Sequence, residues 1–133
     1  ENLIVGSNYY YTIDNPDNKK FVEAYKKKFK GVPPGYAGAA GYGLMKMTLL
    51  GMQKSGSTEP QKVITALEEH KGKNFVGNFE IRGRNHQTVR PFFVLQTKKK
   101  SEMKNQYDMA EVVDVSSTEQ PKNINMCKDI GSF

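Results

Sequence analysis

The chain has 133 residues, of which 37% are hydrophobic, and this length fits one domain or part of a larger protein. Lys and Arg number 20 against 14 Asp and Glu, which gives a formal net charge of +6. No run of about 18 apolar residues occurs, which excludes a membrane-spanning helix of ordinary length.

The positive charge is dispersed and is not interleaved with aromatic residues. Two clusters are local, Lys26–Lys28 on an expected helix and Lys98–Lys100 on an expected loop. A solvated surface is therefore favoured over a face for nucleic acid or anionic membrane, and we expect no nucleic acid among the partners. A small basic nucleic-acid-binding domain is the competing hypothesis, and salt-dependent retention of DNA or RNA would favour it.

The single cysteine, Cys127, has no CxxC partner, and this excludes a zinc site built from cysteines. In an exported protein a lone cysteine suggests a partner outside the chain, and a buried or free thiol is the alternative. The sequence starts in a strand-like run without Met and without a signal peptide, so we expect the gene to begin upstream of residue 1.

The first expected strand spans residues 3–11, which are rich in β-branched and aromatic side chains. Turn residues follow over 12–17, and Asp17 or Asn18 is expected to cap the first helix. Gly31 is expected to end that helix. Its apolar face, at helical spacing, consists of Phe21, Val22, Tyr25 and Phe29.

Two further helices are expected without an intervening strand. The second runs from about residue 36 to residue 55 and ends at Gly56. Its inner face is expected to consist of Ala37, Ala40, Leu44, Met47, Thr48 and Gly51. The third spans about residues 59–71, has Pro60 in its first turn and ends at Gly72. Its buried stripe is expected to consist of Val63, Ile64 and Leu67.

The hydrophobic period then changes from helical to two. Strands are expected over residues 75–81, 89–97 and 107–115, with a turn at 82–85 and a polar loop at 98–106. The element order is β-α-α-α-β-β-β, which is an α/β chain whose first strand has no evident partner. This order is typical of part of a larger α/β protein.

Motifs for nucleotide binding or catalysis are missing from the sequence. The Gly-rich stretch 31–44 lacks the GxxxxGK[ST] pattern and does not follow a strand. His70 and His86 lie far apart, so each is expected at the surface or at a helix cap. The adjacent Glu68 and Glu69 point in different directions, and no GxSxG elbow occurs. We therefore expect a protein that is not an enzyme and has neither cofactor nor metal.

The glycines and alanines at the start of the second expected helix need another reason. Small side chains leave backbone N–H groups accessible there, and carboxylates favour that electropositive end. The stretch would then form the floor of a ligand cleft. The alternative is tight helix packing under a neighbouring strand, and physical reasoning alone favours the packing.

Four segments, in order and spacing, resemble the last third of type I periplasmic solute-binding proteins. They are NPDNKKFVEAYKKKF, YAGAAGYGLMKMTLLGMQKSGS, EPQKVITALEEHKG and FVGNFEIRGRNHQTVRPFFVLQ. The branch they resemble contains the leucine/isoleucine/valine-binding proteins of ABC importers. The resemblance covers nearly the whole chain. The residues that carry it include Phe21, Val22, Tyr25, Pro34, Gly41, Tyr42, Gly77, Asn85, His86, Gln87 and Pro91.

The resemblance implies a partial periplasmic-binding-protein type I fold, in which two α/β lobes joined by hinge strands close on a ligand. By analogy, residues 1–11 form a hinge-crossing strand and residues 12–88 belong to the N-terminal lobe. Residues 89–116 return to the C-terminal lobe, and 117–133 form a tail. Family members are more than twice this length, so a missing N-terminal part is implied. Exposed sheet edges would also allow copies of the fragment to associate.

The implied function is that of an extracytoplasmic solute-binding component of an ABC importer, periplasmic or extracellular. It would bind an amino acid or an aromatic or other organic acid and deliver it to a membrane permease. A ligand-binding sensory domain of a receptor on the same fold is the alternative.

Most residues that hold the ligand in this family lie upstream of this chain. The resemblance implies five ligand-binding positions here: Tyr9, Tyr10, Tyr36, Gly38 and Ala39. Relatives often have a bulky residue where Gly38 and Ala39 stand, so the pocket is expected to admit a larger or aromatic ligand.

Overall fold

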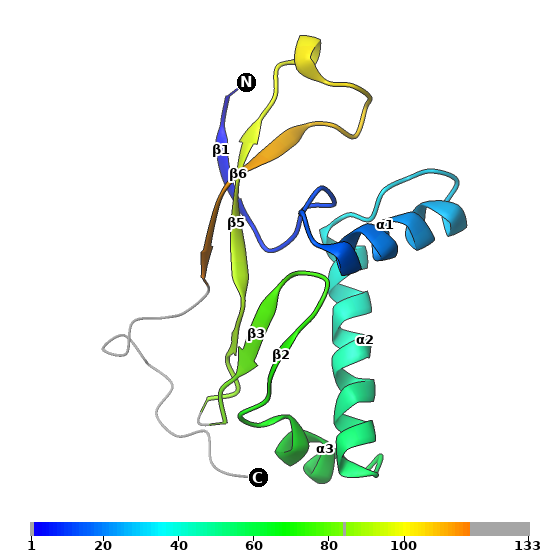
Figure 1. Cartoon of the computed structure of the whole chain (residues 1–133), viewed down its shortest axis with the longest axis vertical. Helices are drawn as coiled ribbons and strands as arrows, with labels where there is room; N and C mark the ends of the chain where they lie inside the picture. Colours follow the sequence, from blue (N-terminus) through cyan, green and yellow to red (C-terminus); the bar gives the residue numbers. More distant parts are fainter. Residues whose placement is uncertain (1, 84, 118–133) are drawn as a thin grey trace.

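The computed structural model describes residues 2–83 and 85–117 (Figure 1). Three helices and two small antiparallel sheets make up this part of the chain. In chain order the elements are β1 (Ile4–Ser7), α1 (Pro16–Lys28), α2 (Tyr36–Ser55), α3 (Pro60–Leu67), β2 (Lys71–Lys73), β3 (Asn78–Ile81), β4 (Thr88–Val89), β5 (Pro91–Thr97), η1 (Lys100–Glu102) and β6 (Ala110–Ser117). The expected β-α-α-α-β-β-β order is confirmed in outline, with the short β2 and β4 and the 3₁₀ turn η1 added.

Helix α1 begins two or three residues earlier than the sequence predicts. Its N-cap is Asn15, whose side-chain oxygen accepts hydrogen bonds from the backbone N–H groups of Asp17 and Asn18. Pro16 occupies the first turn, where its missing N–H costs nothing. The expected cap at Asp17 or Asn18 is therefore wrong, since Asn18 is turned inward and fully buried.

Helix α2 has the predicted bounds because its ends are signalled locally. Gly35 stands at its N-cap, and Gly56 closes it in the left-handed conformation with φ of 63°. Its predicted inner face is wrong in most positions, since only Ala39 and Gly51 are buried. Leu44, expected inside, is 71% exposed. Within the described residues, no helix combines the length and apolar character needed to cross a membrane.

The chain leaves the helical conformation after Leu67, earlier than expected. Glu68 is already extended, and Glu69 takes a left-handed φ of 56° that turns the chain back. Gly72 consequently lies inside β2 and does not end α3.

The first sheet has the order β1-β5-β6, with both pairs antiparallel. Its register places Ile4 opposite Gln96 and Ser7 opposite Phe93. This corrects the expectation that the first strand lacks a partner within the chain. The strand is also shorter than predicted, because the tyrosines at 9–11 lie in a turn outside it.

The second sheet has the order β2-β3-β4 and lies between the first sheet and α2 in Figure 1. Its middle strand begins at Asn78, because Phe75 and Val76 lie in a turn and are buried there. Gly77 has φ of 141°, a conformation that glycine adopts readily and other residues rarely adopt. A Cβ at this position would also lie 2.7 Å from Pro91 Cγ. The last strand is displaced, from 107–115 as predicted to Ala110–Ser117.

One hydrophobic core joins α1 and α2 to the first sheet. It also takes in the turn before α1 and the turn before β3. Its buried members are Tyr9, Ile13, Phe21, Val22, Ala39, Phe75, Val76, Phe93, Leu95 and Ala110. Residues 118–133, with Cys127 and nearly all of the predicted tail, lie outside the described residues, and Ser117 ends β6.

Gly51 is predicted to be required for the contact between α2 and α3. A Cβ at this position would lie 2.8 Å from Val63 Cγ1 and 3.0 Å from Leu67 Cδ1. We expect Gly51→Val to lower the free energy of unfolding by about 1–3 kcal/mol through overpacking. Gly41→Val is the matched control, since nothing lies within 4 Å of a Cβ there. Urea unfolding followed by circular dichroism measures both, and equal midpoints would contradict the prediction.

Candidate functional site

The turn between β1 and α1 is fixed by a buried asparagine. The Tyr9 hydroxyl donates to Asn18 Oδ1 at 2.9 Å. The Asn18 amide nitrogen donates to the carbonyl oxygens of Tyr11 and Ile13, both at 3.0 Å. Burial raises the pKa of the Tyr9 hydroxyl well above its usual value, so it remains a donor at physiological pH. The three bonds hold residues 9–13 against α1.

An aromatic cluster continues from this turn into the helices. The rings of Phe21 and Tyr42 stack with centroids 4.4 Å apart. Phe75 lies 5.1 Å from Phe21 and 5.9 Å from Tyr9 between ring centroids. These contacts join α1, the first half of α2 and the turn before β3, and aromatic ring pairs add to the energy of burial.

A cavity of about 470 Å³ opens beside this cluster. It lies between the end of β1, the first half of α2, the turn before β3 and the segment leading into β5. Most of its wall is apolar, and this volume is within the range usual for small-molecule pockets. Its lining residues are Asn8, Tyr9, Tyr36, Ala39, Ala40, Gly43, Leu44, Met47, Asn74, Phe75, Val76, Thr88 and Arg90.

Two of the polar lining residues serve the fold itself. Asn74 Oδ1 accepts from the backbone N–H groups of Val76 and Gly77. The Asn74 carbonyl oxygen accepts from Asn15 Nδ2 at 3.0 Å. The Tyr9 hydroxyl likewise serves the fold, because it donates to Asn18 Oδ1. Of the remaining polar groups, Arg90 Nη1 donates to the carbonyl oxygen of Asn8 at 3.4 Å, which joins the two strand ends at the mouth of the cavity.

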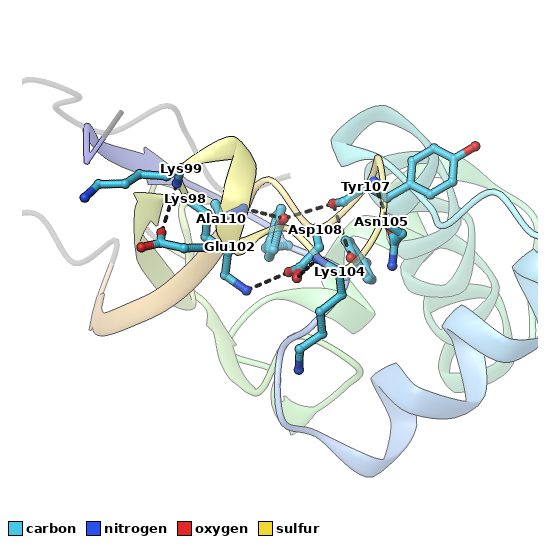
Figure 2. A network of polar contacts seen from close by, with 10 residues as sticks. Lys98, Lys99, Glu102, Lys104, Asn105, Tyr107, Asp108 and Ala110 are labelled. Carbon is cyan, nitrogen blue, oxygen red and sulfur yellow. Dashed lines mark hydrogen bonds and ion pairs between the residues drawn. The ribbon is translucent and has the colours of Figure 1, made fainter.

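A second polar network lies on the other side of the turn at residues 9–13, which we call the tyrosine turn. This network holds the turn to the first sheet. Figure 2 shows the Lys98 side chain reaching Asp108, beside which the backbone of Lys104 also lies. Lys98 Nζ lies 2.7 Å from Asp108 Oδ1, and the backbone N–H of Lys104 donates to Oδ2 at 3.0 Å. The ammonium group of Lys98 lowers the pKa of the Asp108 carboxyl, and the Lys104 N–H adds to this effect.

Two tyrosines attach this network to the turn. The Tyr10 hydroxyl donates to the Tyr107 carbonyl oxygen at 3.3 Å and accepts from the backbone N–H of Ala110 at 3.0 Å. The Tyr11 hydroxyl donates to the same carbonyl oxygen at 3.2 Å. The turn is thus bonded to α1 on one side and to the start of β6 on the other.

Comparison with known protein families identifies the chain. The family profile described as "Periplasmic binding protein" matches residues 1–102. The chain belongs to the periplasmic binding protein family. A comparison with curated protein sequences gives no match.

Solved structures of periplasmic binding proteins match the fold closely. An amino acid ABC transporter substrate-binding protein from Pseudomonas fluorescens Pf-5 is 27% identical, with a TM-score of 0.82, over 90% of this chain and 32% of that one. An ABC-type branched-chain amino acid transporter from Rhodopseudomonas palustris CGA009 is 25% identical, with a TM-score of 0.71, over 86% of this chain and 30% of that one. The type I periplasmic binding fold expected from the sequence is confirmed. The chain spans about a third of the length of these structures.

A more distant neighbour shares the fold alone. It is a solute-binding protein of an ABC transporter from Rhodopseudomonas palustris BisB5, in complex with 3,4-dihydroxybenzoic acid. It is 21% identical, with a TM-score of 0.71, over 84% of this chain and 29% of that one.

The structure brings together three of the five sequence-predicted site residues of this periplasmic binding protein. Tyr9, Tyr36 and Ala39 line the cavity. Gly38 does not, because a Cβ there would lie 3.0 Å from the Tyr25 hydroxyl oxygen, on the side facing α1. Tyr10 does not either, because its hydroxyl is bonded to the loop before β6. That any of the five contacts a ligand stays a prediction.

Sequence analysis missed Asn8 and Arg90, which face the same cavity from two strand ends 82 residues apart. No local motif marks either residue. Both are polar residues at strand ends, and this position points to a shared cavity only once the pairing of β1 with β5 is known.

The histidines are held by neighbouring charged groups. Lys54 Nζ lies 2.9 Å from His70 Nδ1, and burial together with this ammonium group lowers the pKa of His70. His86 Nε2 lies 2.8 Å from Glu68 Oε1. Across residues 2–83 and 85–117, no group of three or more His, Cys, Asp or Glu side chains is arranged to hold a metal ion.

The Tyr9 hydroxyl is predicted to stabilise the turn at the cavity. Tyr9→Phe removes the only hydroxyl in the described bonds of Asn18 and leaves its buried Oδ1 without that donor. We expect a loss of about 1–3 kcal/mol in the free energy of unfolding. Tyr36→Phe, at a side chain that is 56% exposed, is the control and should change stability little. Chemical denaturation decides, and a Tyr9→Phe variant as stable as the control would contradict the assignment.

Asp108 is predicted to make stability depend on pH at the acid end. Its folded pKa is lowered, so its contribution is complete above its unfolded pKa of about 3.9 and is lost as pH falls through the folded pKa. Asp108→Asn should therefore destabilise the protein most above about pH 5, with the difference from wild type shrinking below about pH 4. Thermal unfolding between pH 3 and pH 7 measures it. Asp14→Asn, in an exposed pair with Lys19, should have a smaller effect, and equal effects would contradict the prediction.

Proposed function

We propose that this chain is the C-terminal part of an extracytoplasmic solute-binding component of an ABC importer. The protein would bind an amino acid or a related organic acid between two lobes and deliver it to a membrane permease. The observation that carries the proposal is the family match over residues 1–102, supported by the amino acid ABC transporter substrate-binding protein that the fold resembles. A periplasmic or extracellular location and a function without catalysis belong to the same proposal.

The sheet pairing supports a hinge made of two segments. Residues 1–11 and 89–116 are the segments proposed to pass between lobes, and their strands β1 and β5 pair antiparallel. Adjacent crossing strands are a suitable connection for two lobes that close on a ligand. Residues 12–88 would then form the part of the N-terminal lobe that presents α2 to the cavity.

The surface of α2 supports the view that the chain is one part of a larger protein. Three of its large apolar side chains are at least half exposed: Leu44, Met45 and Leu49. A helix that is apolar on most of its surface is normally covered by other structure. The matched proteins are about three times this length, and under this proposal the rest of the protein would supply the cover.

Small side chains at the start of α2 support a roomy pocket. Ala39 and Ala40 line the cavity where a bulky residue would reduce its volume. Under this proposal an aromatic acid or a large amino acid would fit better than a small aliphatic one.

A thermal-shift screen tests the proposed function on the longest natural reading frame that contains this sequence. The panel consists of the standard amino acids and a set of benzoic acids, with sugars and nucleosides as control classes. At a ligand concentration of about 100 times Kd, binding should stabilise the protein by about 2.7 kcal/mol. Stabilisation by an amino acid or organic acid supports the proposal, with the aromatic members expected to rank first.

Two outcomes would contradict parts of this proposal. Stabilisation by sugars or nucleosides alone would overturn the ligand class. Stabilisation by small aliphatic amino acids, with no effect of any larger ligand, would overturn the expected pocket size.

A further inference from the structure

Arg90 is the cationic group of an otherwise neutral cavity. Among the described residues that line the cavity, it is the only one with a formal charge at neutral pH. Much of the remaining lining is apolar, and Leu44, Met47 and Phe75 contribute to it from α2 and the turn before β3. A pocket with one cationic end and an apolar body is complementary to a small molecule with one anionic group.

The position of Arg90 is set by the fold. It stands between β4 and β5, and Pro91 begins the strand that pairs with β1. Its Nη1 donates to the carbonyl oxygen of Asn8, which follows the other strand of that pair. The side chain is half-buried, so the guanidinium is held at the cavity by both proposed crossing strands. A guanidinium has five N–H donors in a planar fork, so one such group can bond several acceptors at once.

We infer that Arg90 is a specificity-determining residue that binds the carboxylate of a small organic acid, whose apolar body lies against Ala39, Ala40 and Leu44. This inference rests on the proposed function. The planar guanidinium fork matches a carboxylate with two parallel N–H···O bonds, which a neutral amide cannot reproduce. Arg90 therefore selects for acids, while the small residues of α2 set the size of the body that is accepted.

Isothermal titration calorimetry of the full-length protein tests this with two matched probe pairs. They are 4-hydroxybenzoate with 4-hydroxybenzamide, and L-leucine with L-leucinamide. We expect the wild type to bind an acid at least about 10-fold more tightly than its amide, as a charge-assisted hydrogen bond implies. In Arg90→Gln the affinity for that acid should fall about 10- to 100-fold. The affinity for the amide should change little.

Two further variants keep the test decisive. Arg82→Gln removes an arginine that bonds Gln87 and does not line the cavity, so it matches the charge change and should leave both affinities unchanged. Arg90→Lys keeps the charge without the planar fork and should bind the acid with intermediate affinity. If Arg90→Gln does not fold, the acid-to-amide ratio of the wild type and the Arg90→Lys variant give the same information.

The outcomes separate the inference from the proposed function. A wild type that binds an acid and its amide equally, or an acid preference that survives in Arg90→Gln, overturns the role of Arg90 and leaves solute binding standing. A wild type that binds none of the four probes and no member of the thermal-shift panel overturns the proposed function, and this inference with it.

Discussion

The buried amide of Asn18 is the interaction on which the rest of the site depends. It is fully buried on α1, and its three hydrogen bonds all reach the turn that follows β1. A buried amide without these partners would cost more than the bonds themselves contribute, so the turn and the helix must form together. The path of the chain from β1 to α1 is thereby determined, and with it the positions of Asn8 and Tyr9 beside the cavity.

The sheet supplies the other half of the site. Pairing of β1 with β5 places the end of one strand beside the start of the other, and this brings Asn8 to Arg90. Helix α2 then approaches from the opposite side, anchored by the stacked rings of Phe21 and Tyr42. The cavity therefore lies where three separate parts of the chain meet, and each part is positioned by a contact outside the cavity wall.

Sequence reasoning succeeded where the signal was local and failed where it was not. The bounds of α2 follow from Gly35 and Gly56, which act within their own turn. The first strand was predicted too long, because aromatic residues favour strands as much as they favour a core, and Tyr9 serves the core. Family resemblance named Tyr36 and Ala39, which line the cavity. Arg90 was not, because only the pairing of distant strands brings it to the cavity.

The bonds on both sides of the tyrosine turn bear on how such a protein would close. Asn18 holds the turn to α1, and the hydroxyls of Tyr10 and Tyr11 hold it to the loop before β6. Bending at the turn would break these hydrogen bonds, whereas rotation about β1 and β5 beyond it would leave them intact. Under the proposed function, the wall formed by Tyr9, Ala39 and Arg90 keeps its shape during closure. Such a wall is preorganised, so ordering it does not reduce the binding energy, and the motion is left to the opposite lobe.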